Sequence, residues 1–257
     1  MEETSFIQWL VLALIQGITE YLPISSSAHL ILVSKIMKWP DQGLVMDIAA
    51  HGGSLLAVMW YFKDELLKLF KGKNWKLFIQ LALASIPLAI CGYIFAGSIE
   101  QHLRSPMVIT ASSIIFGVIL FLSDKVQKTK PNQSEFGIKQ AVIVGFSQIL
   151  ALIPGASRSG VTMSAAMSMG FDRKKAARFS FLLAIPALLM TTGYGFMKLY
   201  QQPSDYNIVG ILTVLIVSFL ASLFSIKVFL KLINKISMAS FMWYRIILGA
   251  LIVVFLQ

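Results

Sequence analysis

The chain has 257 residues, of which 57% are hydrophobic and 13% charged, and its mean hydropathy is +0.76. Soluble domains carry about 25% charged residues, so this composition excludes a mainly water-exposed surface and predicts an integral membrane protein. The net charge of +10 does not indicate a nucleic-acid partner, because the basic residues form short clusters between apolar segments. The only cysteine, Cys91, excludes an intrachain disulfide. The start Met1-Glu2-Glu3 lacks a basic segment, so no cleaved signal peptide is expected.

Two apolar stretches of the chain are each broken near the middle. Residues 6–33 are interrupted by Leu22 to Ser27, and residues 139–170 are interrupted in the same way by Ile153 to Gly160. Proline, glycine and serine favour turns and helix caps, so each stretch predicts two half-helices joined by a polar loop. Such a loop is tolerated in a membrane only where protein or a wet cavity covers it.

Six other segments are apolar and long enough to cross a bilayer as helices, which takes about 20 residues. They are residues 46–62, 78–97, 107–123, 179–197, 208–226 and 241–256. Basic residues concentrate in four of the connecting segments, and the positive-inside rule makes those segments cytoplasmic. They are residues 63–76, 125–139, 173–178 and 227–235. It follows that 139–170 is a re-entrant hairpin from the cytoplasmic side, 6–33 dips in from outside, and both termini face outside.

The two broken stretches suggest an internal repeat. Superposing Pro23 on Pro154 aligns Ser26 with Ser157, at an offset of 131 residues. Each half then has one broken stretch and three spans, and because three is odd the second half is inserted upside down. The predicted fold is one all-α membrane domain, residues 1–257, with inverted repeats at approximately 1–125 and 135–257. The alternative is two ordinary proline-kinked helices.

The first broken stretch carries candidate catalytic groups. Gln16 and Glu20 share a helix face, and a carboxylate within an apolar stretch indicates a functional group or an interfacial one. Ser25, Ser26 and Ser27 follow the proline, where they can cap a helix whose N-terminus attracts anions. His29 lies three residues after Ser26 and four after Ser25, so one helical turn can bring its imidazole near either hydroxyl. A hydroxyl near an imidazole is the minimal activated nucleophile, although the same pair can be a structural cap.

The second broken stretch carries one arginine among hydroxyls. The guanidinium of Arg158 can bind a phosphate in a planar, bidentate manner, or it can reach the lipid headgroups. Its neighbours with hydroxyl side chains are Ser157, Ser159 and Thr162. Two half-helix N-termini, hydroxyls, one arginine, one glutamate and one histidine suit a phosphate ester with a counter-ion.

These segments resemble a known family. Gln16 to His29 is similar to a (Glu/Gln)-x-x-x-Glu region followed by Ser-Ser-x-x-His, and Pro154 to Thr162 is similar to the box Pro-Gly-x-Ser-Arg-Ser-Gly-x-Thr. Both belong to the undecaprenyl-pyrophosphate phosphatases, the bacitracin-resistance family. The resemblance continues in Asp47 to Tyr61, in Phe179 to Leu183 with Pro186, and in Tyr244-Arg245. Gln16 stands at the first acidic position, which leaves Glu20 as the only carboxylate there.

The resemblance implies hydrolysis of undecaprenyl pyrophosphate to undecaprenyl phosphate and inorganic phosphate. This reaction recycles the lipid carrier for peptidoglycan synthesis and gives bacitracin resistance. It also implies a divalent cation, Mg²⁺ or Ca²⁺, with Glu20 as ligand or general base. Ser26 would be the nucleophile or a positioning hydroxyl, His29 its acid/base partner, and Arg158 the phosphoryl clamp. The implied substrate-binding residues are Ser25, Ser27, Ser157, Ser159, Gly160, Thr162 and Gln16.

The expected partners are the polyprenyl pyrophosphate lipid and the membrane, with a homodimer left open. The expected location is the bacterial inner or plasma membrane, with the site on the outer, periplasmic side. His51, near Asp47, is expected to be a hydrogen-bonded interfacial residue or a metal-site neighbour, and Arg245 is expected to reach the cytoplasmic headgroups. Competing functions are a flippase for a phosphorylated polyprenyl lipid, which shares the inverted-repeat architecture, a phosphatase with a histidine nucleophile, and a scaffold.

Overall fold

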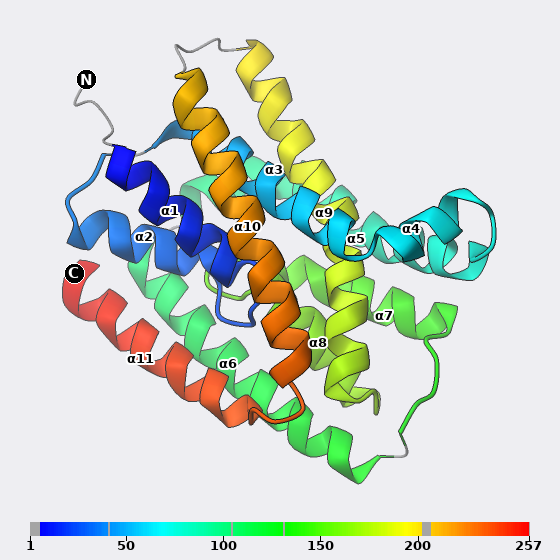
Figure 1. The fold of residues 1–257 in the computed structure, drawn as a ribbon. Helices are drawn as coiled ribbons and strands as arrows, with labels where there is room; N and C mark the ends of the chain where they lie inside the picture. The colour runs from blue at the N-terminus through cyan, green and yellow to red at the C-terminus, as the bar shows by residue number, and fades with distance from the viewer. Residues whose placement is uncertain (1–5, 41, 104, 131, 202–206, 257) are drawn as a thin grey trace.

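The fold is all-helical in the computed structural model, which describes residues 6–40, 42–103, 105–130, 132–201 and 207–256 (Figure 1). Within these ranges the helices are α1 (Phe6–Thr19), α2 (Ser26–Ile36), α3 (Gly43–Tyr61), α4 (Lys63–Phe70), α5 (Trp75–His102), α6 (Pro106–Thr129), α7 (Ile138–Gln148), the short 3₁₀ helix η1 (Ile149–Leu152), α8 (Arg158–Ser168), α9 (Arg173–Gln201), α10 (Ile208–Leu232) and α11 (Met238–Leu256).

Six of these helices are long and apolar enough to cross a membrane: α3, α5, α6, α9, α10 and α11. They correspond to the six predicted spans, so the prediction of a polytopic all-α membrane protein is confirmed. The helices are longer than the sequence segments in places. Polar and basic residues extend them beyond the apolar stretch, as in α9, which begins at Arg173 and ends at Gln201.

Both broken stretches are interrupted at the predicted loops. The first helix of the chain ends at Thr19 and α2 begins at Ser26, while α7 and η1 end at Leu152 and α8 begins at Arg158. The longest of these pieces, α7 with η1, spans residues 138–152, and each of the others has 14 residues or fewer. A helix rises 1.5 Å per residue, so a single piece is too short for the roughly 30 Å apolar core of a bilayer. Their entry from opposite membrane faces stays a prediction.

Corresponding helices of the two halves start at similar intervals. Helices α2 and α8 start at residues 26 and 158, and α6 and α11 at 106 and 238, each pair 132 residues apart. The superposition of the prolines gives an offset of 131 residues, one less than this interval. The equivalent positions are the helix-capping serines, Ser25 and Ser157, because both have φ 69° and both accept from the N–H three residues later.

Helices α1, α3 and α10 approach closely through small residues. A Cβ atom added at Gly53 of α3 would lie 2.4 Å from the Leu215 carbonyl oxygen of α10, and one at Gly17 of α1 would lie 2.6 Å from the Ala221 Cβ. Small residues allow this close approach in membrane-embedded helices. Buried hydroxyls link α3 and α10 at the same level: Ser54, Ser218 and Ser222. This packing fixes the end of α1 that carries Glu20.

A buried ion pair joins α6 and α9 at the end predicted to be cytoplasmic. The Arg173 guanidinium of α9 donates to both carboxylate oxygens of Asp124 in α6, at 2.5 and 2.7 Å, and to the Ile236 carbonyl before α11 at 2.8 Å. The Asp124 side chain is 3% exposed. This contact lies outside the cavity described next.

Candidate active site

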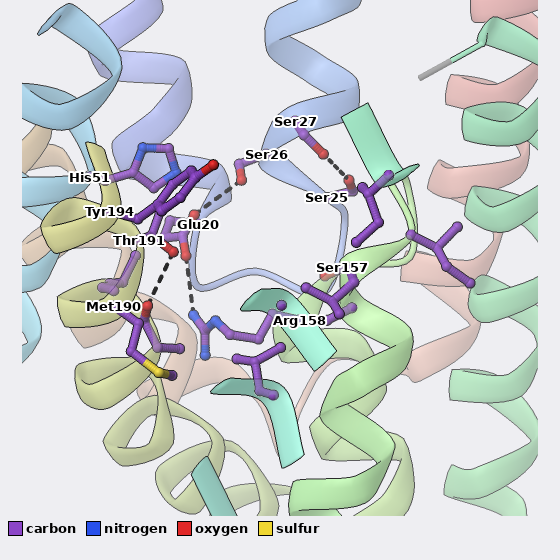
Figure 2. A pocket seen from close by; sticks show the side chains of 18 of the residues that line it. Glu20, Ser25, Ser26, Ser27, His51, Ser157, Arg158, Met190, Thr191 and Tyr194 are labelled. Carbon is purple, nitrogen blue, oxygen red and sulfur yellow. Dashed lines mark hydrogen bonds and ion pairs between the residues drawn. The ribbon is translucent and has the colours of Figure 1, made fainter. Parts of the chain in front are cut away.

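The two loops meet at one cavity of about 570 Å³ (Figure 2). Its polar lining comes from both halves of the chain, with Glu20 and Ser26 from the first loop region and Arg158 from the second. The rest of the wall is mainly apolar and is formed by residues of α5, η1 and α9. These are Leu88, Ala89, Gly92, Tyr93, Ile99, Ala151, Leu152, Ile153, Ala187, Leu188, Met190, Thr191 and Tyr194. The cavity thus joins a small polar region to a long apolar surface.

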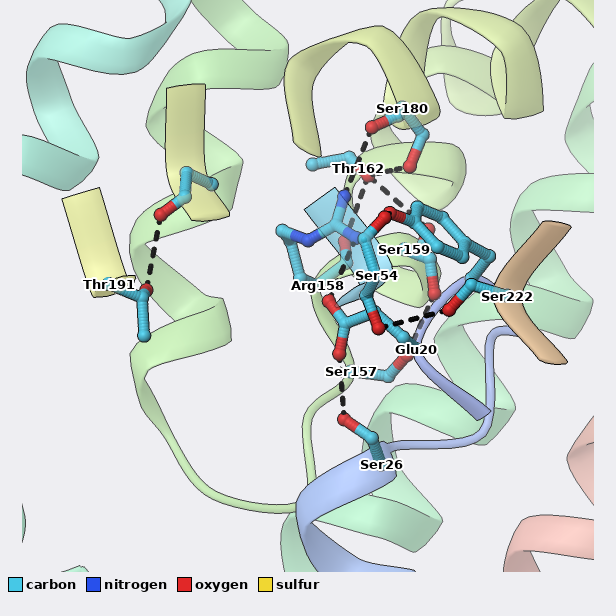
Figure 3. A network of polar contacts seen from close by, with 12 residues as sticks. Glu20, Ser26, Ser54, Ser157, Arg158, Ser159, Thr162, Ser180, Thr191 and Ser222 are labelled. Carbon is cyan, nitrogen blue, oxygen red and sulfur yellow. Dashed lines mark hydrogen bonds and ion pairs between the residues drawn. The ribbon is translucent and has the colours of Figure 1, made fainter. Parts of the chain in front are cut away.

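Glu20 is the centre of the polar region (Figure 3). Its Oε2 accepts from the Gln16 Nε2 and from the Ser26 Oγ, both at 3.0 Å, and its Oε1 accepts from the Arg158 Nη2 at 3.2 Å. The carboxylate and guanidinium side chains are 8% and 12% exposed. A carboxylate that accepts a hydroxyl proton at this distance is placed to act as its general base.

Arg158 is held in a fixed orientation by three groups. Besides Glu20, its Nη1 donates to the Ser180 carbonyl at 3.1 Å, and its guanidinium carbon lies 6.0 Å from the centre of the Tyr21 ring. Tyr21 is itself fixed, because its hydroxyl donates to the Ser54 carbonyl at 2.6 Å. The guanidinium therefore faces the cavity with little freedom to move, which is what binding of a tetrahedral anion requires.

Two helix N-termini begin beside this cluster. Ser25 caps α2 and Ser157 caps α8, and both serines have φ 69°, which a residue other than glycine rarely adopts. Their Oγ atoms lie 3.2 Å from the Oγ atoms of Ser27 and Ser159, respectively. Free N–H groups and the helix dipole make such an end attractive to anions. Such a backbone conformation persists only where the surrounding structure holds it, so the contacts around these two caps define their positions.

His29 does not pair with Ser26 as expected. Its Nδ1–H donates to the Ser25 carbonyl at 2.7 Å, its Nε2 accepts from the Tyr244 hydroxyl at 2.6 Å, and the two rings are stacked. Helical spacing did bring His29 to Ser25, but to its carbonyl, because the ring turns toward α11. The hydrogen-bond partner of the Ser26 hydroxyl is Glu20.

Three other predicted substrate-binding residues are engaged behind the cavity wall. The Ser159 hydroxyl donates to the Leu22 carbonyl of the opposite loop at 2.8 Å. The Thr162 hydroxyl donates to the Arg158 carbonyl at 2.8 Å and shares a 2.7 Å contact with Ser180 Oγ. Gly160 lies against another arginine, Arg245, where an added Cβ would be 3.0 Å from Nη1. The Ser159 contact joins α8 to the first loop and the Thr162 contact joins α8 to α9, whereas Ser25, Ser27 and Ser157 line the cavity.

The cavity also includes residues to which the sequence assigned no catalytic role. His51 of α3 lines it, with Nδ1–H donating to the Asp47 carbonyl at 2.8 Å, and Tyr194 of α9 lines the same cavity (Figure 2). Arg245 does not reach the headgroups, which corrects that expectation. Its side chain is fully buried, and it binds backbone carbonyls between α6 and the two loops. Its position in an apolar span gave no signal for these contacts.

The oxygen atoms around Glu20 fit a hard divalent cation. The Gln16 Oε1 is buried and has no hydrogen-bond partner among the described residues, although the rest of that amide contacts Glu20. With the Ser26 hydroxyl, these groups provide carboxylate, amide and hydroxyl oxygens. Mg²⁺ is commonly held by one or two carboxylates together with substrate phosphates. No cluster of three His, Cys, Asp or Glu residues occurs in the described ranges.

Comparison with known proteins identifies the family. Residues 9–251 match the family described as Bacitracin resistance protein BacA. The chain is 44% identical over 251 residues to a protein of Campylobacter curvus named undecaprenyl-diphosphatase, covering 93% of this chain and 95% of that protein. It is 43% identical over 256 residues to a Campylobacter concisus protein of the same name, covering 94% and 95%. With its length matched almost throughout, the chain belongs to the BacA family of bacitracin resistance proteins.

Proposed function

We propose that this chain is an undecaprenyl-diphosphatase, which removes the terminal phosphate of undecaprenyl pyrophosphate and so returns the lipid carrier to peptidoglycan synthesis. The reaction also accounts for bacitracin resistance. The observation that carries the proposal is the contact of Ser26, Glu20 and Arg158, from the two halves of the chain, in one cavity. Family membership and the names of the relatives support it.

The two-part character of the cavity suits a lipid pyrophosphate. The diphosphate would bind at the polar end, near Arg158 and the N-termini of α2 and α8, which neutralise its charge. The polyprenyl chain would follow the apolar wall past Gly92 of α5 and Leu152 of η1. A free polar phosphate compound would gain nothing from this apolar surface, so the cavity favours a lipid substrate.

The side chains support a two-step phosphoryl transfer. The Ser26 Oγ attacks the terminal phosphorus while its proton passes to Glu20. The bond from that phosphorus to the bridging oxygen breaks, and the polyprenyl monophosphate leaves with the proton returned by Glu20. Water then attacks the phosphoserine while Glu20 accepts a water proton, the bond from phosphorus to the Ser26 Oγ breaks, and Glu20 returns that proton to Ser26 as inorganic phosphate is released. Arg158 binds the equatorial oxygens in both steps, and positioning with charge neutralisation supplies most of the catalysis in phosphoryl transfer.

Replacement of the serine distinguishes this route from direct attack by water. Ser26→Ala should lower kcat by at least about 100-fold if the hydroxyl is the nucleophile, because a whole covalent step is lost. A loss of a few-fold would instead favour attack by water with Ser26 as a positioning group. The matched control is Ser27→Ala, whose hydroxyl lines the same cavity but contacts Ser25 rather than Glu20. Phosphate release by both variants is the measurement.

A divalent cation, Mg²⁺ or Ca²⁺, is part of the proposal, with Glu20, the Gln16 amide oxygen and Ser26 as protein ligands. When bound, it would neutralise charge on the diphosphate. Treatment of the purified protein with EDTA should therefore abolish phosphate release, and added Mg²⁺ or Ca²⁺ should restore it. Cation binding should also be seen without turnover, as a rise in thermal stability that Glu20→Gln removes. Full activity in excess EDTA would exclude the cation.

The proposed location is the bacterial inner or plasma membrane, with the cavity on the outer side. The basic residues make the starts of α5 and α9 cytoplasmic. The cavity is lined by the later parts of both helices, residues 88–99 and 187–194, which are then in the outer half of the membrane. Whether the protein works as a homodimer is a separate expectation, to be tested by light scattering in detergent.

One assay tests the proposed function as a whole. The detergent-purified chain is mixed with undecaprenyl pyrophosphate, and inorganic phosphate and undecaprenyl phosphate are measured together. Equal amounts of both products support the phosphatase. Tight binding of the lipid without release of phosphate would support the flippase instead, since transport leaves the pyrophosphate bond intact.

A further inference from the structure

The side chain of Arg245 is fully buried in the middle of the molecule, within the membrane-spanning helix α11. An arginine in such a position is costly unless its donors are satisfied, because the guanidinium stays charged in proteins. In the described part of the chain no Asp or Glu forms an ion pair with Arg245, unlike Arg173, which pairs with Asp124. Some other group must therefore account for its burial.

Backbone carbonyls take the place of a carboxylate. The Arg245 Nε donates to the Ser113 carbonyl of α6 at 2.8 Å, and Nη2 has a longer contact of 3.5 Å with that of Ser112. Nη2 also donates to the carbonyls of Gly155 and Ala156 in the second loop, at 2.8 and 2.9 Å. The remaining contact, from Nη1 to the Pro23 carbonyl in the first loop, is 3.4 Å. One side chain thus contacts both loops of the cavity.

The contacted carbonyls lie directly before the capping serines. Pro23 is two residues before Ser25, and Ala156 is the residue before Ser157. The loop held through Pro23 connects Glu20 to Ser26, and the loop held through Ala156 leads into Arg158. Movement of either loop would separate the hydroxyl from the carboxylate or from the guanidinium that faces the substrate. Only arginine has five N–H donors in a planar fork, so lysine cannot replace these contacts.

We infer that Arg245 is a positioning residue for phosphatase catalysis: it fixes the two loops relative to each other, so that Ser26, Glu20 and Arg158 stay in reacting geometry without Arg245 touching the substrate. This inference rests on the proposed function and adds a residue to it. The positioning role explains why a charged side chain is kept within an apolar, membrane-spanning helix. Small displacements of reacting groups lower rates steeply, with about 1 Å costing on the order of 100-fold.

The direct test replaces the guanidinium. Arg245→Gln should lower kcat by about 10- to 100-fold, on the scale expected for misplaced reacting groups. KM should change much less, because the apolar wall that binds the lipid chain is untouched. The matched control is Arg173→Gln, which removes a partly buried arginine at the first residue of α9, outside the cavity, and should leave the kcat of the folded protein within about two-fold.

A second pair of variants disturbs Arg245 without removing it. A Cβ at Gly117 of α6 would lie 3.3 Å from the Arg245 Cβ and 3.5 Å from its Nε, so Gly117→Ala should displace the side chain and lower kcat several-fold. Gly249→Ala is the matched control. Its Cβ would meet Ile114 at 3.2 Å and Thr110 at 3.3 Å in the same α6–α11 contact, without touching Arg245. Its kcat should stay near that of the wild type.

Amide hydrogen exchange provides a readout that does not depend on activity. Arg245→Gln should raise exchange in both loops, residues 20–27 and 153–158, while Arg173→Gln should not. If the wild-type chain releases no phosphate, the proposed function fails, and exchange still decides whether Arg245 joins the loops. A folded Arg245→Gln protein with wild-type kcat and unchanged loop exchange would overturn the inference. Should that variant not fold, an unchanged kcat in Gly117→Ala, or an equal loss in Gly249→Ala, would overturn it.

Discussion

Arg158→Ala is expected to lower kcat/KM for undecaprenyl pyrophosphate by about 1,000-fold or more, the effect known for arginines that stabilise charge in phosphoryl transfer. The guanidinium faces the cavity, and its ion pair with Glu20 at 3.2 Å can be exchanged for phosphate oxygens when the substrate binds. The protein should still fold, because Glu20 keeps its hydrogen bonds from Gln16 and Ser26. Phosphate release and thermal unfolding, measured on the same preparation, test both statements.

Two further variants test whether the loss of activity in Arg158→Ala is specific to this guanidinium. Arg158→Lys restores the charge but not the planar pair of donors, so it should recover only a small part of the activity. Arg178→Ala removes the arginine that pairs with Glu65 outside the cavity, and it should retain wild-type activity. Near-normal turnover by Arg158→Ala would exclude a phosphate-binding role for this side chain.

Glu20→Gln is expected to lower kcat by about 100- to 10,000-fold, the range for loss of a general base. The change keeps the shape of the side chain but removes the charge that accepts the Ser26 proton and pairs with Arg158. It also removes the only carboxylate among the proposed cation ligands. Loss of less than ten-fold in the phosphate-release assay would show that the proton goes elsewhere.

Substitution of the neighbouring Gln16 distinguishes the two proposed roles of Glu20, general base and cation ligand. Gln16→Glu adds a second carboxylate at the position where the family also has glutamate, and it should lower the cation concentration that gives half-maximal activity, because Mg²⁺ and Ca²⁺ favour carboxylate oxygens. If Glu20 acts only as a base, Gln16→Glu should leave the cation requirement unchanged. The control Glu65→Gln removes a carboxylate outside the cavity, and it should alter neither kcat nor the cation concentration that gives half-maximal activity.

Much of the fold follows from local sequence features. Six apolar segments predicted the six long helices, and proline, glycine and serine predicted both interruptions, because these signals depend on the backbone and on lipid rather than on distant contacts. Ser26 and Arg158 line one cavity and both contact Glu20, as expected if the two broken stretches meet. Gln16 and Glu20 contact each other as their helical spacing predicted.

The errors concern side chains whose partners lie far along the chain. His29 binds Tyr244, 215 residues away, so spacing from Ser26 alone could not show where its ring points. Arg245 was expected to extend to the headgroups because its carbonyl partners belong to loops about 90 and 222 residues earlier. Every residue has a backbone carbonyl, so residue types do not show which carbonyls accept from a distant side chain. For the same reason the sequence did not separate Ser159 and Thr162, which contact the first loop and α9, from Ser157, which lines the cavity.

The ion pair between Glu20 and Arg158 has a consequence for how the protein is made. Its two members are 138 residues apart and belong to opposite halves of the chain. While the ribosome is still synthesising the first half, the carboxylate has no cationic partner, and an unpaired charge in lipid is costly. The pair can therefore form only after residue 158 has been synthesised. Assembly of the reactive centre is then completed late in translation, and no product that ends before residue 158 contains it.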